Sequence, residues 1–422
     1  MTEPTSPLQI ADFRLYWLSR LTATLATVGM VVIIGYQLYD VARGQYGMQI
    51  TEAAFLLGLL GLAQFVPLAI FTPVAGVVAD RFDRRTVAAT AMSLDLTVAL
   101  TLAITTYSGL VSLPLLFLLA ALHGTARVFI GPALSAVVPN IVPAPLIPRA
   151  MAMSSMAWQT GAIGGPALAG LLYGLGHAMP YWISSALLVL GILALLAVRK
   201  LPPPDGNRDV HPIRQVIDGF HYVWNERFLL GCVTLDLFAV LLGGATALLP
   251  VFARDILHVG PEGLGIMRAA PAIGAVVVSL WLSARPIAHN VGAKMLWGVA
   301  AYGAATILFG ISRNFALSLA VLALVGAADM VSVFIRSTLI QLNTPDNVRG
   351  RVSAISGLAI SASNELGEMQ SGLAAGLLGA TGAVVFGGAG AIMIVVLWAW
   401  LFPELRNART FAPHYRQRET EG

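Results

Sequence analysis

The chain contains little charge and only one cysteine. Of its 422 residues, 11% are Asp, Glu, Lys or Arg, whereas 57% are hydrophobic and the mean hydropathy is +0.79. Soluble domains carry about a quarter charged residues, so this composition excludes an ordinary soluble protein. Cys232 has no second cysteine for an intrachain disulfide. Residues 1–11 are polar and lack a basic start, so we expect no cleaved signal peptide.

The sequence also lacks the motifs of nucleotide-dependent and hydrolytic enzymes. It contains no phosphate-binding loop, zinc-ligand spacing or nucleophile elbow, and its glycine pairs lie inside apolar stretches, where helix packing explains them. We therefore expect a chain that is not an enzyme, hydrolyses no ATP and binds no metal or organic cofactor. The formal charge of +4 raises the question of an anionic partner. Because the basic residues follow membrane topology, we expect no nucleic acid.

Long apolar runs are abundant instead. Runs of about 20 apolar residues can cross a bilayer as helices, and they do not alternate as barrel strands do. The sequence predicts an all-α polytopic membrane protein with twelve transmembrane helices. These spans lie near residues 16–39, 53–79, 87–107, 113–136, 150–174, 180–198, 229–252, 262–284, 292–312, 315–340, 352–378 and 382–402.

The longest break between spans divides the chain into six spans and six spans. It begins with three prolines, and Val216, Ile217, Phe220, Val223 and Trp224 recur in it at helical spacing, which predicts an amphipathic helix on the membrane surface. We expect an N-terminal half over 1–199, a cytoplasmic linker over 200–227, a C-terminal half over 228–403 and a cytoplasmic tail over 404–422.

Positive charge predicts the orientation of the chain. With the N-terminus inside, 18 of the 25 Lys and Arg residues lie in cytoplasmic tails and loops, so both termini are expected in the cytoplasm. Weak similarity between the halves favours two pseudo-symmetric repeats. A chance alignment of glycine-rich helices is the alternative.

A charged loop at residues 76–85 separates two apolar spans. It reads Gly-Val-Val-Ala-Asp-Arg-Phe-Asp-Arg-Arg and resembles the signature loop between helices 2 and 3 of the major facilitator superfamily, except that Asp83 replaces a glycine. The resemblance implies the major facilitator fold. It also implies a conformational gate, in which the Asp80 anion would face the N-terminus of span 11. The gate residues are Gly76, Asp80, Arg81, Arg84 and Arg85. Alternatively, the charges of the loop only fix topology.

Span 5 resembles the motif of the antiporter branches of this superfamily. The motif residues are Gly161, Gly165, Pro166 and Gly170. Physically, small residues allow close helix packing and a proline bends the helix, so plain packing is the alternative explanation.

Charged residues inside spans are costly, which makes a functional role the first hypothesis for them. Arg127 and Gly131 in span 4 resemble the superfamily motif associated with proton transfer, and His123 lies one turn earlier on the same face. A structural ion pair of Arg127 with Asp95 is the alternative. Glu365 and Glu368 share one face of span 11, and repulsion between two carboxylates in an apolar setting suits a proton carrier. Alternatively, they are hydrogen-bonded acids that lock helices together. Asp329 and Arg336 lie seven residues apart on one face of span 10, so Arg336 is expected to pair with Asp329 through water or with span 11. Proton coupling is assigned to Glu368, Glu365, Arg127, Asp236, Asp329, His123 and Arg336.

Most of the chain is similar to the enterobactin-exporter-like branch of the superfamily. The similarity rests on Asp12-Phe13-Arg14 with Trp17 and Arg20, on the charged loop, on the segment Asn343–Arg351 and on the acidic region of span 11. It implies a monomeric, proton-coupled exporter of siderophores, drugs or similar amphiphilic metabolites in the bacterial inner membrane, surrounded by lipid and working by alternating access. A lysophospholipid transporter is the alternative. The expected substrate-cavity residues are Arg20, Thr24, Thr27, Gln159, Arg268 and Asn364. Arg20 lies close enough to the inner membrane surface for its side chain to reach it, so an interface anchor is the alternative for this residue.

Overall fold

Helices make up the regular structure of this chain. The computed structural model describes residues 6–201, 212–285 and 287–411, apart from the side chains of residues 73, 76–77, 79–80, 212–216, 346–347 and 354. No strand occurs in these described ranges. The apolar runs explain this outcome, because a helix satisfies its own backbone hydrogen bonds where water is absent. The predicted all-helical fold class is confirmed.

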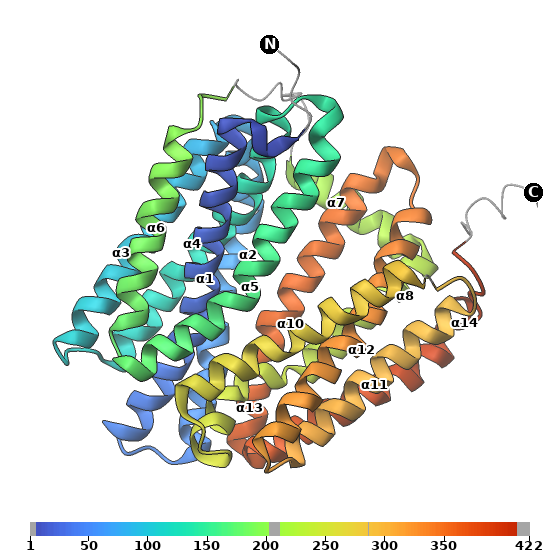
Figure 1. The fold of residues 1–422 in the computed structure, drawn as a ribbon. Helices are drawn as coiled ribbons and strands as arrows, with labels where there is room; N and C mark the ends of the chain where they lie inside the picture. The colour runs from blue at the N-terminus through green and yellow to red at the C-terminus, as the bar shows by residue number, and fades with distance from the viewer. Residues whose placement is uncertain (1–5, 202–211, 286, 412–422) are drawn as a thin grey trace, which may run out of the picture. The chain divides into compact units, whose positions relative to one another are not determined.

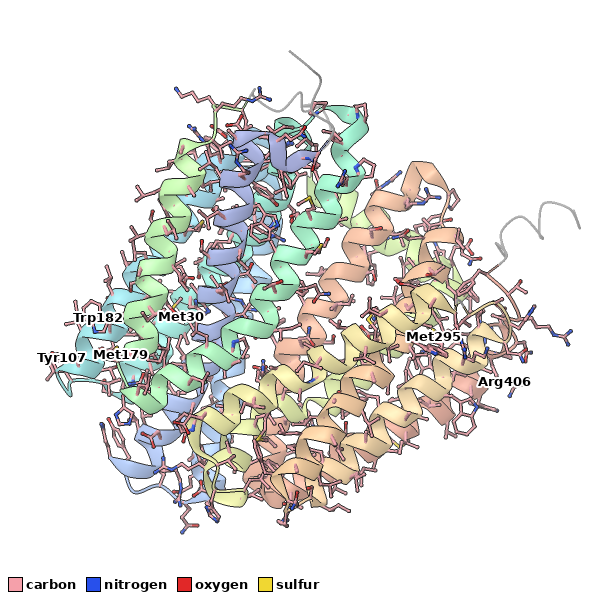
Figure 2. All side chains as sticks on the ribbon, viewed as in Figure 1. Met30, Tyr107, Met179, Trp182, Met295 and Arg406 are labelled. Carbon is pink, nitrogen blue, oxygen red and sulfur yellow. The ribbon has the colours of Figure 1, made fainter. Side chains whose placement is uncertain are left out.

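Ten helices in the described ranges are long and apolar enough to cross a membrane. Large apolar side chains are exposed along them, as expected for surfaces that face lipid. Tyr107 and Trp182 lie on the outside, whereas Met30 and Met295 are buried (Figure 2). Helix α5 (Ile147–Leu175) is not among the ten, because Gly, Ser and Thr lower its hydropathy, and α13 (Asp346–Leu401) counts once.

The chain divides into two compact units. Unit 1 is formed by residues 1–48, 62–209 and 258–269. Its helices α1, α3, α4, α5 and α6 pack against one another (Figure 1). Helix α1 is the most enclosed of the candidate spans, with Phe13, Tyr16 and Ile33 completely buried. The elements of this part of the chain are η1 (Pro7–Gln9), α1 (Ala11–Gly44), α2 (Ile50–Arg81), α3 (Arg84–Tyr107), α4 (Leu113–Ile141), η2 (Ala144–Leu146), α5 and α6 (Met179–Ala197).

Unit 2 is formed by residues 49–61, 210–257 and 270–422. Its core gathers Cys232, Met295, Ile335 and Leu339 from α8, α11 and α12. The elements are α7 (Pro212–Asn225), α8 (Arg227–Gly243), η3 (Ala245–Leu248), α9 (Leu249–Val251), the π-helical turn η4 (Phe252–Ile256), α10 (Gly260–Ala284), α11 (Val291–Ile311), α12 (Phe315–Leu342), α13 and α14 (Pro403–Arg406). The segment 258–269, which includes the start of α10, belongs to unit 1, and the segment 49–61, which includes the start of α2, belongs to unit 2.

The predicted amphipathic segment forms α7. Its Val223 side chain is buried, while Ile217, Phe220 and Trp224 are about half exposed, so the helix has two distinct faces. Gly219 lies against the backbone of Arg351 on α13, which fixes the inner face of α7 within unit 2. The rings of Phe220 and Trp224 stack on the exposed face with centroids 5.7 Å apart.

Helix α13 is interrupted at Gly379. This residue has φ 72° and ψ 166°, a backbone conformation that residues other than glycine rarely adopt. The break falls between the predicted spans 352–378 and 382–402, so α13 consists of two helices that meet at the glycine.

Glycines of α5 allow close packing against α1 within unit 1. A Cβ atom on Gly161 would lie 2.6 Å from the Thr24 Cβ atom, and one on Gly165 would lie 2.7 Å from the Leu25 carbonyl oxygen. Gly170 faces the Pro261 carbonyl oxygen of α10, which also belongs to unit 1. Three glycines of the motif predicted for span 5 therefore form packing surfaces. Helices in lipid gain their contacts from this kind of close approach.

We expect Gly165→Ala to lower the melting temperature of the purified protein, because its methyl group would overlap the α1 backbone. Overpacking typically costs about 1–3 kcal/mol. Gly357→Ala is the matched control, since Gly357 also lies in a helix and has no atom within 4 Å of its Cβ position. Alanine is otherwise the better helix former by about 1 kcal/mol, so the control should melt at the same or a higher temperature. Equal melting temperatures for the two variants would show that the α1–α5 contact is not tight.

Candidate functional site

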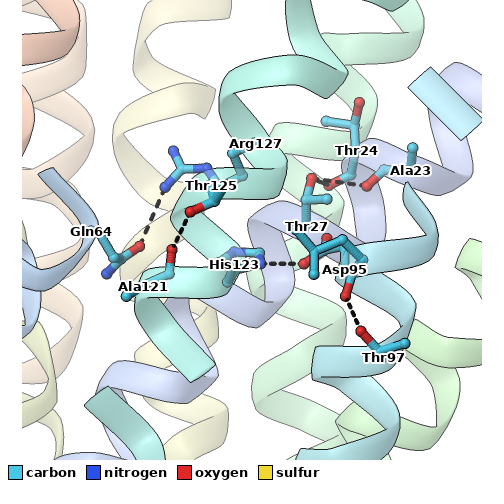
Figure 3. A network of polar contacts seen from close by, with 11 residues as sticks. Ala23, Thr24, Thr27, Gln64, Asp95, Thr97, Ala121, His123, Thr125 and Arg127 are labelled. Atoms are coloured by element: carbon cyan, nitrogen blue, oxygen red, sulfur yellow. Dashed lines mark hydrogen bonds and ion pairs between the residues drawn. The ribbon is translucent and has the colours of Figure 1, made fainter. Parts of the chain in front are cut away.

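Unit 1 contains two polar pairs around α4, seen together in Figure 3. His123 Nδ1 lies 2.6 Å from Asp95 Oδ1 of α3, and both side chains are completely buried. One turn along α4, Arg127 Nη1 donates to Gln64 Oε1 of α2 at 3.4 Å. Asp95 was the alternative partner of Arg127 in the sequence analysis, but the structure gives this carboxylate to His123. His123 and Arg127 are neighbours on α4, as predicted, yet they bond to different helices.

The Asp95–His123 pair leaves one atom on each side unused. Asp95 Oδ2 and His123 Nε2 are buried and have no hydrogen-bond partner among the described residues. Orphaned polar atoms of this kind cost free energy in an apolar bundle. The pair therefore joins α3 to α4. It also leaves an unsatisfied hydrogen-bonding atom on each of the two side chains.

The predicted substrate-cavity residues have different surroundings. Thr24 donates to its own helix at Arg20 O (2.8 Å), and Thr27 donates to Ala23 O (2.9 Å), so both hydroxyls are used within α1. Arg20 Nη1 donates to the Gly131 carbonyl oxygen of α4 at 3.3 Å. Gln159 on α5 is exposed in unit 1. Two further members of the set are Arg268, which is half-buried on α10, and Asn364, which is exposed on α13.

The loop after α2 is tied down by its arginines. Arg84 Nη1 donates to Ala136 O near the end of α4 at 3.2 Å. Arg85 donates to Leu196 O (3.2 Å) and to Val198 O, where α6 ends. Cations at the carbonyl end of a helix complete its hydrogen bonds and favour its dipole. These two predicted gate residues therefore hold helix ends within unit 1.

Asp83, which replaces a glycine of the superfamily pattern, has a structural role. Its side chain accepts a hydrogen bond from the Arg85 backbone at 3.0 Å and so caps the start of α3. Arg81 is exposed in the last turn of α2. The side chains of Gly76 and Asp80 lie outside the described residues, so the predicted contact between Asp80 and span 11 is not tested.

The embedded charges of unit 2 centre on Arg336. Its Nη1 atom forms an ion pair with Asp236 Oδ1 of α8, and both side chains are buried. Asp329, two turns earlier on α12, interacts electrostatically with both members of the pair. Sequence spacing suggested Asp329 or span 11 as the partner of Arg336, whereas the structure selects Asp236. The neighbouring Tyr302 hydroxyl donates to Gly243 O at 2.8 Å.

Glu365 and Glu368 lie where α13 contacts α2 within unit 2. Glu365 is 8% exposed and Glu368 is half-buried. A Cβ atom on Gly61 of α2 would lie 3.1 Å from the Glu368 Cβ atom, and one on Gly372 would overlap the Gly58 Cα atom. The glycines bring the α2 backbone against the face of α13 that carries the two acids.

Sequence reasoning missed Gln64, Tyr302 and the glycine contact of α2 with α13. Gln64 is a polar residue inside an apolar run, and that signal could have identified it. Nothing local distinguishes Gly58, Gly61 or Tyr302 from other residues of apolar helices, because their roles depend on the neighbouring helix. Among the described residues, no three His, Cys, Asp or Glu side chains gather as a metal site.

Comparison with known proteins agrees with this architecture. Residues 2–418 match the family described as transmembrane secretion effector. The chain is 28% identical over 413 residues to the enterobactin exporter EntS of Escherichia coli O1:K1 / APEC and 27% identical to that of Citrobacter koseri, with 95% of this chain and 94% of each relative covered.

Solved structures show the same fold at low sequence identity. A D-xylose-proton symporter superposes with a TM-score of 0.69 and 15% identity, covering 94% of this chain and 98% of that chain. A POT family transporter in complex with 5-aminolevulinic acid gives 0.71 and 13%, covering 94% and 97%. The fold and the matches define a multi-pass bacterial membrane transporter of the major facilitator superfamily. The chain belongs to the transmembrane secretion effector family. The two similar relatives described above are enterobactin exporters. The predicted branch of the superfamily is confirmed, and transporter relatives agree with a chain that is not an enzyme.

The buried ion pair makes a direct prediction. Asp236→Asn or Arg336→Met alone should destabilise the protein by about 3–5 kcal/mol, because each removes one partner of a buried ion pair. The double variant should recover much of this loss. Chemical unfolding in detergent measures all three.

The control is Asp218→Asn, which removes the exposed ion pair of Asp218 with Arg351, where the closest atoms are 3.6 Å apart. Exposed pairs contribute about 0–1 kcal/mol, so this variant should unfold like the wild type. Single variants at Asp236 or Arg336 that are no less stable than the control would contradict a desolvated pair.

Proposed function

We propose that this protein exports an amphiphilic metabolite of the siderophore class across the bacterial inner membrane, in exchange for protons. The main support is the similarity to enterobactin exporters over 95% of this chain and 94% of those relatives. Similarity over nearly the whole length makes a shared transport cycle the simplest explanation.

We also propose twelve membrane spans in two six-helix halves. The ten candidate helices become twelve when α5 is added and α13 is divided at Gly379. Both termini and the linker with α7 are then cytoplasmic, as the distribution of Lys and Arg predicts. The half boundaries remain those of the sequence analysis, and the working unit is a monomer.

Proton coupling is assigned to the acidic side chains of unit 2. Asp236, Asp329, Glu365 and Glu368 all lie in apolar helices, and only Arg336 among the residues assigned to coupling on α8, α12 and α13 is a cation. A carboxylate that gains a proton loses its charge, and this change alters the relative stability of two conformations that surround the group differently. Arg127 and His123 in unit 1 complete the proposed coupling set. The loop with Arg84 and Arg85 is the proposed gate, since any change in its position would move the ends of α4 and α6.

The export proposal predicts accumulation in inside-out membrane vesicles. Enterobactin added outside should concentrate in the lumen when the lumen is acidic, because protons leaving the lumen drive entry of the substrate. A protonophore should abolish this uptake. Drugs and lysophospholipids should be assayed in parallel. Accumulation of lysophospholipid alone would instead favour the lipid-transporting alternative. Uptake of enterobactin that is equal with and without the pH gradient would contradict antiport.

Glu368→Gln should abolish gradient-driven accumulation while leaving exchange of labelled for unlabelled substrate. Glutamine keeps the shape and hydrogen bonding of the side chain but carries no proton. Glu404→Gln on the exposed helix α14 is the control and should transport normally. If Glu365→Gln uncouples transport and Glu368→Gln does not, the assignment moves to Glu365. Normal accumulation in both variants would remove the two glutamates from the mechanism.

A further inference from the structure

Arg20 is an embedded cation whose donors are mostly unused. The residue is half-buried on α1, and its Nη1 atom donates to a single neutral acceptor, Gly131 O, at 3.3 Å. Its Nε atom is buried without a hydrogen-bond partner in the part of the chain that the structure describes. Among the described residues no carboxylate forms an ion pair with it, and Tyr16 lies one turn earlier on α1. Tyr16 itself is held by Ser154 at 2.6 Å.

Space is present beside this guanidinium. A Cβ atom on Gly131 would have no atom within 4 Å, so α4 has an open position next to its contact with Arg20. Ser135, one turn further on, is exposed and donates its hydroxyl to the same Gly131 carbonyl at 2.9 Å. The Arg20 guanidinium and the Ser135 hydroxyl thus both donate to the Gly131 carbonyl, where the Cβ position of Gly131 has no neighbouring atom among the described residues.

A partly desolvated guanidinium without an anion is unfavourable. Five N–H donors in a planar fork match the two oxygens of a carboxylate or phosphate, and one distant carbonyl leaves most of that capacity unused. Charge-assisted bonds to an oxyanion are roughly twice as strong as neutral ones. The unpaired guanidinium lowers the stability of the protein without ligand, and a ligand with an oxyanion would supply the negative charge that it lacks.

We infer that Arg20 binds an oxyanion of the transported molecule, namely a carboxylate, phenolate or phosphate group. The inference rests on the proposed export function and names the substrate class: an amphiphile with an acidic group. Arg20 is also separate from the residues assigned to proton coupling, which are Asp236, Asp329, Glu365, Glu368 and Arg336 in unit 2 and His123 and Arg127 in unit 1. The anionic group of the substrate and the proton would thus use different residues.

Binding to the purified, full-length protein in detergent tests this inference without a proton gradient. The probes are matched pairs: 1-naphthaleneacetate with its methyl ester, and lysophosphatidylglycerol with a monoacylglycerol of the same chain length. The wild type should bind the acidic member of at least one pair about tenfold more tightly than the neutral member. The pair that shows this preference distinguishes a soluble acid from a lipid phosphate as the source of the oxyanion.

Arg20→Gln should remove the preference, and Arg20→Lys should reduce it severalfold, because lysine keeps the charge but loses the fork. Arg14→Gln is the control, since Arg14 is exposed and donates to Leu8 O at 3.0 Å. If Arg20→Gln does not fold, Arg20→Lys decides.

A wild type that binds acids and neutral probes alike, or a folded Arg20 variant with an unchanged preference, overturns the inference. Enterobactin export that persists in vesicles after such a result leaves the proposed function intact. Conversely, acid binding that depends on Arg20 without any export overturns the proposed function alone.

Discussion

Polar groups inside these helical units have to be satisfied without water, and most of the structure follows from that constraint. Backbone groups are satisfied by helices, and hydroxyls such as that of Thr27 return to their own helix. Charged groups need partners from other helices, so Asp236 of α8 meets Arg336 of α12 and Asp95 of α3 meets His123 of α4. These pairs determine which helix faces lie together, because a misplaced partner would leave a bare charge in an apolar interior.

Glycine contacts bring other pairs of helices close together. Lipid offers helices no hydrophobic gain from association, so close backbone contact becomes a main source of attraction. Gly165 against Leu25 brings α5 onto α1, and Gly372 against Gly58 brings α13 onto α2. The second contact places the face with Glu365 and Glu368 beside a neighbouring backbone. In unit 2, the glycine contact and the two acids therefore occupy the same turns of α13, which links any movement of α2 or α13 to the surroundings of the acids.

The fold could be predicted from sequence to within a few residues, whereas the partners in the candidate site could not. Helix α3 begins at Arg84 where the apolar pattern predicted a start at 87, because Asp83 caps it. The partner of Arg336 was expected on α12 itself or on span 11, yet it comes from α8. Helical spacing shows which residues share a face, but it does not show which helix that face meets.

The sequence by itself determined that this chain forms apolar helices, where they are interrupted, and that its embedded charges demand an explanation. Those properties depend on local composition and on the length that a helix needs to cross a bilayer. Only the tertiary structure decided that Asp95 belongs to His123, that Gln64 meets Arg127, and that Arg20 has a carbonyl rather than a carboxylate as its neighbour. Such pairings arise between segments far apart in the chain, because the rotation and crossing of packed helices depend on the shapes of both partners.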